Sequence, residues 1–258
     1  MNDLEKYFNQ NEGRLIHKWQ HYFEIYDRHF CAFRGKEINV LEIGVSHGGS
    51  LQMWKDYFGP KARIFGVDVN PECKNFEEEN VEIFIGSQSD RGFLGELRDK
   101  VPPIDILIDD GGHTMTQQIV TFEELFDHIK PTGVYLCEDL HTSYWQKFGG
   151  GHERRGTFVE YSKNLIDKIN AFHSEQKSLS VDAFTRSVNS VHYYDSIIVV
   201  EKRPRQSPSH SQRGEPALAA IPTEKTGEFM SRVRFLRVTL LGFLDDVLRF
   251  MGLPGIWR

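Results

Sequence analysis

From residue 38 onward, short aliphatic runs alternate with amphipathic segments, and this alternation constrains the fold more than any other feature of the chain. Strands that alternate with helices form a parallel sheet covered by helices on both faces. We therefore predict an α/β fold with strands at 38–43, 62–69, 81–86, 104–108 and 134–137, and helices at 49–57, 91–100, 116–128 and 162–173. The segments 183–187 and 191–201 are predicted to close the sheet as a further pair of strands.

The N-terminal segment and a later linker differ from this central domain, which we place at 38–202. Residues 1–37 carry many aromatic side chains at roughly helical spacing and predict a helical segment packed on the domain. Residues 203–228 are rich in Pro, Ser and charge, and predict a disordered linker.

Residues 229–258 predict an amphipathic C-terminal helix. Two interpretations of it stay open. The helix either associates with a partner or a second copy of the chain, or it lies peripherally on a membrane with its arginines toward anionic headgroups. We expect a homo-oligomer. The predicted apolar face comprises Val233, Leu236, Leu240, Phe243, Leu244, Val247 and Met251.

Composition narrows the class of protein. The formal net charge of −6 at pH 7 gives no overall basic surface, so we expect no nucleic-acid partner. The three cysteines form no CxxC pair and indicate reduced thiols. The N-terminal residues include no apolar targeting segment, and no run of about 18 apolar residues is present to span a bilayer. We therefore expect a cytoplasmic protein.

Acidic residues follow two of the predicted strands. Asp110 and His113 follow the fourth strand, and Glu138 and Asp139 follow the fifth. In an open α/β sheet, ligands bind beyond the carboxyl ends of the strands. Three carboxylates brought together there repel one another unless a cation lies between them. Because Mg²⁺ binds through a few carboxylates and keeps positions open for water or substrate, it is the metal we expect.

A glycine-bearing turn follows the first strand, where Gly44 is followed by Gly48 and Gly49. Glycines in such a turn let a ligand approach the backbone closely. Their spacing does not match the GxGxxG pattern of NAD-binding domains, so an NAD-dependent reductase is disfavoured. Asp68 ends the second strand, where an acid can accept hydrogen bonds from a ribose, and the polar turn 86–90 after the third strand suits an adenine edge.

The order and spacing of these motifs resemble a class I S-adenosylmethionine-dependent methyltransferase. That fold is Rossmann-like, with a mostly parallel seven-stranded sheet and a closing antiparallel strand. The sequence IDDGGH followed by YLCEDLHTSYW further resembles the metal-dependent sugar O-methyltransferases of macrolide biosynthesis and the related cephalosporin-hydroxylase-like proteins. The resemblance covers about residues 14–202.

This resemblance implies a role for each motif residue. Asp110, Glu138 and Asp139 would bind Mg²⁺, and His113 would act as the general base. Ser87 stands where relatives often carry Asp in a GDQ turn. The pocket for S-adenosylmethionine would be lined by Glu42, Gly44, Ser50, Asp68, Gln88, Asp90 and Asp109.

The function we expect is Mg²⁺-dependent transfer of a methyl group from S-adenosylmethionine to a hydroxyl of a sugar or glycosylated metabolite. Two alternatives stay open. One is a hydroxylase-like or non-methylating protein that binds S-adenosylmethionine on the same fold, and the other is a non-catalytic scaffold subunit. The retained carboxylates and His113 argue against the scaffold.

Overall fold

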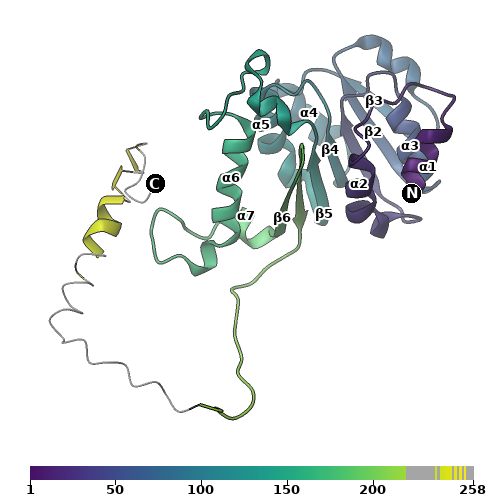
Figure 1. Cartoon of the computed structure of the whole chain (residues 1–258). Helices are drawn as coiled ribbons and strands as arrows, with labels where there is room; N and C mark the ends of the chain where they lie inside the picture. Colours follow the sequence, from purple (N-terminus) through teal and green to yellow (C-terminus); the bar gives the residue numbers. More distant parts are fainter. Residues whose placement is uncertain (219–235, 237–238, 246, 249, 252, 254–258) are drawn as a thin grey trace.

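The computed structural model describes residues 1–218, 236, 239–245, 247–248, 250–251 and 253, and its central feature is a seven-stranded sheet (Figure 1). The strands are β1 (Asn39–Ile43), β2 (Arg63–Asp68), β3 (Val81–Ile85), β4 (Ile104–Asp109), β5 (Ile129–Cys137), β6 (Val188–Tyr194) and β7 (Ile197–Lys202). The helices are α1 (Asp3–Gln10), α2 (Tyr22–Phe30), α3 (Gly49–Phe58), α4 (Arg91–Lys100), α5 (Met115–Leu125), α6 (Phe158–Ile169) and α7 (Ala183–Ser187).

The strand order is β3-β2-β1-β4-β5-β7-β6. Neighbours among β1 to β5 pair in parallel, whereas β7 is antiparallel to both β5 and β6. The predicted fold class is therefore confirmed, with a mostly parallel sheet and an antiparallel closure. Because β2 lies on one side of β1 and β4 on the other, the strand order reverses at β1. Open α/β sheets bind ligands at such a switch point.

Alternate residues of each strand pack on opposite faces of the sheet. Val40 of β1 and Ile106 of β4 belong to one core cluster, whereas Leu41 and Leu107 belong to the other. Helices α1, α2 and α3 contribute to the first cluster, and α4, α5 and α6 to the second. Parallel strands covered on both faces must be apolar along their whole length, which explains the continuous aliphatic runs in the sequence.

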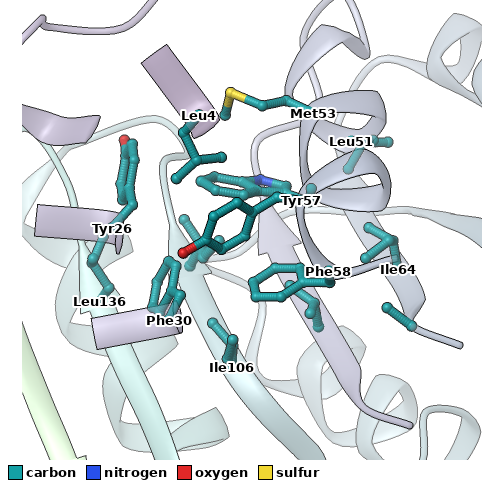
Figure 2. Close-up of a cluster of buried hydrophobic side chains, with 14 of the residues drawn as sticks. Leu4, Tyr26, Phe30, Leu51, Met53, Tyr57, Phe58, Ile64, Ile106 and Leu136 are labelled. Carbon is teal, nitrogen blue, oxygen red and sulfur yellow. The ribbon is translucent and has the colours of Figure 1, made fainter. Parts of the chain in front are cut away.

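Aromatic side chains of the N-terminal helices fill the first core (Figure 2). The ring of Trp54 in α3 meets the rings of Tyr26 and Phe30 in α2 edge-on, with centroids 5.1 and 6.0 Å apart. Leu4 of α1 is fully buried in the same cluster. The helices α1 and α2 are therefore part of the domain's core.

The sequence predicted a helical segment at residues 1–37, but only part of this segment is helical. Asn2 and Glu5 form a capping box that starts α1, and the helix ends at Gln10. Residues 11–21, here called the N-terminal strap, separate α1 from α2 and contain no α-helix. The strap residues 15–19 line a cavity at the carboxyl edge of the sheet.

Two predictions near the end of the domain are wrong. The segment Ala183–Ser187 forms helix α7 rather than a strand, because Asp182 and Thr185 form a capping box that starts a helix. The run 191–201 is not a single strand, because it turns at Asp195 and Ser196, and Ser196 has a left-handed φ of 66°. The closing pair is therefore the hairpin of β6 and β7.

Much of the predicted C-terminal region lies outside the described residues. Residues 203–218 contain no helix or strand and 206–218 are exposed, whereas 219–228 of the predicted linker are not described. Residues 239–245 are helical, and Leu240 and Phe243 are 64% and 66% exposed. Association or membrane attachment through 229–258 stays a prediction. Among the described residues, no helix has the length and apolar character needed to cross a membrane.

A buried histidine fastens α2 to the closing hairpin. The Nδ1 atom of His29 lies 2.7 Å from Glu201 Oε1, and its Nε2 atom lies 2.9 Å from the hydroxyl of Tyr194. Burial lowers the pKa of His29 below its ordinary value of 6.5, and the partly opposing effect of Glu201 does not restore it. The folded protein therefore binds a proton at this ring less readily than the unfolded chain does.

The His29 contact predicts how stability changes with pH. Its contribution to the free energy of unfolding is complete above pH 6.5 and is lost as the pH falls below that value, because the unfolded ring then takes up a proton. The slope approaches about 1.4 kcal/mol per pH unit at most. In urea unfolding at pH 7.5 and 5.5, His29→Gln should show a shallower pH dependence than wild type, and exposed His152→Gln should match wild type. Parallel pH profiles for wild type and His29→Gln would contradict this account.

Candidate active site

The residues that follow β1, β4 and β5 form the candidate site. The hydrogen-bond ladder continues past the strands, since Asp110 N donates to Ile43 O and Glu138 N donates to Asp109 O, each at 2.9 Å. This register sets Gly44, Asp110 and Glu138 side by side at the carboxyl edge of the sheet.

Two adjoining cavities open at this edge and share Gly44, Ser46, Asp110 and Gly111. The first, here called the acidic cavity, has a volume of about 250 Å³. The second, here called the β2 cavity, measures about 210 Å³ and extends toward the ends of β2 and β3. The site therefore offers two connected spaces. The acidic cavity is lined in part by Lys18, Trp19, Tyr22, Ser50, Asp110, His113, Glu138 and Asp139.

A glycine is required at position 44, where the two cavities meet. Its φ is +98°, and a Cβ atom would overlap the backbone carbonyl of Asp110. Only glycine combines this φ with such a close approach. At Gly111 the constraint is space alone, since a Cβ atom there would overlap the buried side-chain amide of Gln88.

An ammonium group from the N-terminal strap lies among the carboxylates of the acidic cavity. Nζ of Lys18 donates to both oxygens of Glu138, at 2.9 and 3.0 Å, and to Oδ2 of Asp110. It also lies 3.9 Å from Oε1 of Glu42. The side chain of Lys18 is only 3% exposed. The sequence required a cation among these acids, and here the chain itself supplies one.

A second group of possible metal ligands includes the other carboxylate oxygen of Asp110, Oδ1. Ligand atoms of Asp110, His113 and Asp139 all lie within 4.8 Å of one another. His113 Nε2 is 3.4 Å from Asp139 Oδ2 and 3.9 Å from Asp110 Oδ1. The hydroxyl of Tyr22 donates to Asp139 Oδ1 at 2.8 Å. Asp110 thus belongs to both groups, with Oδ2 toward Lys18 and Oδ1 toward His113.

Two of these residues have strained backbones. His113 and Asp139 adopt left-handed φ values of 57° and 56°. Such conformations are uncommon for residues other than glycine and persist where the surroundings enforce them. Thr142 supplies part of that support, because its hydroxyl lies 3.0 Å from the carbonyl oxygen of His113 and 2.8 Å from that of Asp139. These hydrogen bonds help to hold the backbone that carries the side chains of His113 and Asp139.

Burial shapes the charges of this cluster. It raises the pKa of Glu42 to about 7 and that of Glu138 well above its ordinary value, and Asp110 raises both further while Lys18 opposes the shift. Burial alone would lower the pKa of Lys18, but Asp110, Glu138 and Glu42 outweigh it and hold that pKa above its usual range. Lys18 is therefore a firmly protonated counter-ion, and it offsets part of the cost that burial imposes on the ionised forms of Glu42 and Glu138.

Asp68 shapes the glycine turn as well as lining the β2 cavity. Its Oδ2 accepts the backbone N–H groups of Val45 and Ser46 at 3.0 and 2.9 Å, and its Oδ1 accepts that of Asn70 at 2.9 Å. A carboxylate offers about four acceptor positions, so capacity remains for a ligand hydroxyl. Asp68 lines the β2 cavity, and its contact with a ribose stays a prediction.

Two other predicted cofactor residues, Gln88 and Asp109, have polar atoms engaged in hydrogen bonds within the protein. Gln88 lines the β2 cavity, but its amide is committed: its oxygen accepts from Gly112 N at 2.7 Å and its nitrogen donates to Asp109 Oδ1 at 2.9 Å. Asp109 is 1% exposed, and burial raises its pKa to about 7. These two side chains fix the Asp109–Gly112 turn rather than reach into open space.

Glu42, Ser50 and Asp90 also take supporting positions. Glu42 is fully buried and accepts hydrogen bonds from Ser50 Oγ at 2.8 Å and Trp54 Nε1 at 3.1 Å, while Ser50 itself lines the acidic cavity. Asp90 caps α4 by accepting from the backbone N–H groups of Gly92 and Phe93, and it is not among the residues that line either cavity. A contact between Asp90 and the cofactor stays a prediction.

The sequence did not point to the strap residues and tyrosines that complete the site. Lys18 and Tyr22 lie about a hundred positions from the acids that they contact, and Tyr26 donates its hydroxyl to Glu138 Oε1 at 2.7 Å. The only indication in the sequence was the excess of negative charge among these acids. A lysine can neutralise that charge as well as a metal ion can.

The donor set fits a hard divalent cation. Asp110, Glu138 and Asp139 bring carboxylate oxygens to one cavity, and oxygen ligands are what Mg²⁺ takes. The ammonium of Lys18 between Asp110 and Glu138 shows that a cation is accommodated there. The imidazole of His113 adds a ligand or proton acceptor within 4.8 Å of two of these acids.

The chain is similar in sequence to known methyltransferases. Residues 41–140 match the family described as a methyltransferase domain. The chain is 37% identical over 193 residues to the 8-demethyl-8-alpha-L-rhamnosyl tetracenomycin-C 2'-O-methyltransferase of Streptomyces olivaceus. This match covers 70% of this chain and 50% of that protein. It is 36% identical over 211 residues to the mycinamicin VI 2''-O-methyltransferase of Micromonospora griseorubida. This second match covers 76% of this chain and 51% of that protein.

A solved structure shares the fold. The MycE methyltransferase from the mycinamycin biosynthetic pathway, in complex with Mg, SAH and mycinamycin VI, superposes with a TM-score of 0.69 at 31% identity. The match covers 91% of this chain and 58% of that one.

The protein therefore has the class I methyltransferase fold, and its residues 41–140 match a methyltransferase domain. Within that class it is similar to the sugar O-methyltransferases of macrolide and tetracenomycin pathways. The chain spans about half the length of the curated relatives that it matches.

Position 44 provides a test of the turn that joins the two cavities. Gly44→Ala should lower the free energy of unfolding by about 2 kcal/mol or more, because alanine is strained at this φ and its Cβ overlaps the Asp110 carbonyl. Gly95→Ala in α4 is the matched control, since a Cβ there meets only Arg98 at an ordinary 3.8 Å. That control should be neutral or more stable by up to about 1 kcal/mol. Equal stability of the two variants in urea unfolding would disprove the close-approach argument.

Proposed function

We propose that this protein is a Mg²⁺-dependent O-methyltransferase that moves a methyl group from S-adenosylmethionine to a hydroxyl of a sugar or glycosylated metabolite. The observation that carries the proposal is the junction of two cavities at Gly44 and Asp110, one bounded by the glycine turn and Asp68, the other by carboxylates and His113. The printed activities of the relatives, methyl transfer to sugars of natural products, support the same reaction.

The β2 cavity suits the nucleoside part of the cofactor. Asp68 offers its remaining acceptor capacity to ribose hydroxyls, and Val69, which is 66% exposed at the end of β2, presents an apolar surface to a purine. Gly44 and Gly111 allow the ligand to lie against the backbone between the two cavities. When bound, S-adenosylmethionine would supply the electrophilic methyl group, so no covalent enzyme intermediate is required.

The acidic cavity suits the acceptor. Asp110, Glu138 and Asp139 would hold Mg²⁺, which would stabilise the negative charge that develops on the acceptor oxygen. His113 takes the hydroxyl proton at Nε2, because this atom faces Asp110 and Asp139 whereas Nδ1 is buried. The neighbouring carboxylates stabilise the imidazolium that results.

The cofactor assignment is tested by calorimetry with S-adenosylmethionine, SAH and NAD, each with and without Mg²⁺. We expect binding of the first two and none of NAD. Binding of NAD alone would refute the proposal, and binding of S-adenosylmethionine without methyl transfer to any glycoside in a mass-spectrometric screen would favour the non-methylating alternative.

The metal role is tested at Asp110. Asp110→Asn should abolish Mg²⁺-dependent turnover and leave affinity for SAH within about threefold, because the carboxylate lost binds the metal rather than the nucleoside. Asp99→Asn, an exposed change at the end of α4, is the control and should match wild type. Turnover that survives both EDTA and Asp110→Asn would remove the metal from the mechanism.

The base is tested at His113. His113→Gln should lower kcat by about 10² to 10⁴ with little change in affinity for the cofactor, because general-base catalysis contributes on that scale. The loss should shrink as the pH rises and hydroxide competes for the proton. An unchanged kcat at pH 7 would exclude His113 as the base, whereas His152→Gln should leave the rate unaltered.

A further inference from the structure

Lys18 occupies the place where the sequence calls for a metal ion. Its Nζ atom bonds to Asp110 and Glu138, two of the three proposed Mg²⁺ ligands, and its side chain is 3% exposed. We infer that Lys18 is an intramolecular competitor of the metal, so that Mg²⁺ takes its full ligand set only when the Lys18 ammonium leaves the carboxylates. This inference rests on the proposed metal site and adds a residue and a regulatory element to it.

The hydrogen bonds of Glu138 place Lys18 in competition with a metal ion for the same carboxylate oxygens. Both carboxylate oxygens accept from Lys18 at 2.9 and 3.0 Å, and Oε1 also accepts from Tyr26 at 2.7 Å. Mg²⁺ approaches oxygen ligands to about 2.1 Å in a strict octahedral arrangement. An ammonium that shares Asp110 and Glu138 with the ion would lie close to it, in a poorly solvated site where repulsion between like charges is strong.

Lys18 is part of a wall of the acidic cavity. Lys18 belongs to the N-terminal strap, whose residues 15–19 line the acidic cavity. The strap is held at one end by Arg14, whose guanidinium donates to Phe76 O at 3.3 Å, and at the other by Tyr22, which bonds Asp139. Between these anchors the ring of Trp19 lies 5.8 Å from that of His141. Withdrawal of Lys18 therefore reshapes the cavity that would receive the acceptor.

The rival account keeps Lys18 in place permanently. In that account Mg²⁺ uses only the outer group of Asp110, His113 and Asp139, and Lys18 remains a structural counter-ion of Glu138 and Glu42. The two accounts differ in whether Lys18 becomes accessible when the metal binds, which can be measured without any turnover assay.

The first test labels lysines of the wild-type protein with N-hydroxysuccinimide acetate at pH 8, with and without saturating Mg²⁺, followed by peptide mass spectrometry. Competition predicts that Mg²⁺ raises acetylation of Lys18 by about fivefold or more, since a group buried in the cluster becomes exposed. Exposed Lys36 serves as the internal control and should not respond. Protection of Lys18 that is unchanged by bound Mg²⁺ overturns the inference.

The second test measures Mg²⁺ affinity by calorimetry at pH 8.5, where competition from protons is small. Lys18→Met keeps the apolar stem and removes the charge, and should bind Mg²⁺ about tenfold more tightly or better than wild type and Lys36→Met. Equal or weaker affinity overturns the inference. Because the variant leaves Glu138 and Glu42 uncompensated, its melting temperature should rise more on addition of Mg²⁺ than that of wild type. If neither protein binds Mg²⁺, the proposed metal site itself fails, an outcome distinct from binding without competition.

Discussion

Buried negative charge at the carboxyl edge of the sheet is the constraint on which the rest of the site depends. Glu42, Asp110 and Glu138 meet where strands end, and two of them are almost wholly removed from water. Such a cluster is tolerated only with a cation at its centre. The Lys18 ammonium meets that need in this structure, and the N-terminal strap is held over the site as a result. The position of the strap, the shape of the acidic cavity and the ionisation of the acids therefore depend on one another.

At the same edge, several polar residues that the sequence assigned to the cofactor pocket form hydrogen bonds within the protein. Gln88 donates to Asp109 and accepts from a backbone N–H group, and Asp90 accepts from the backbone of α4. The hydrogen bonds of Gln88 hold the turn at Asp109–Gly112, whose backbone lies against Gly44. The methyl transfer that we propose would need a donor and an acceptor held within reach of each other, and rigid turns would provide that alignment. The supporting polar residues therefore matter through the geometry that they enforce on the Gly44 and Asp110 backbone.

The fold was predictable where the chain repeats one local rule. Five aliphatic runs became the parallel strands β1 to β5, because a strand covered on both faces must be apolar throughout. Prediction failed where local signals were short. Five residues at 183–187 carry too little periodicity to distinguish a helix from a strand, and a capping box decided the outcome. The turn at Asp195 and Ser196 carries no glycine to mark it, so the hairpin looked like one strand.

The sequence by itself determined which polar residues follow each strand. Because parallel strands end at the same edge of the sheet, it also determined that these residues would lie together there, namely Asp110, His113, Glu138 and Asp139. It also determined that this gathering demands positive charge. Only the tertiary structure decided where that charge comes from. Lys18 lies 92 and 120 positions from its partners Asp110 and Glu138, and nothing local in the strap records that contact. Burial, which sets both the pKa of the acids and the need for a counter-ion, is a property of packing and not of local sequence.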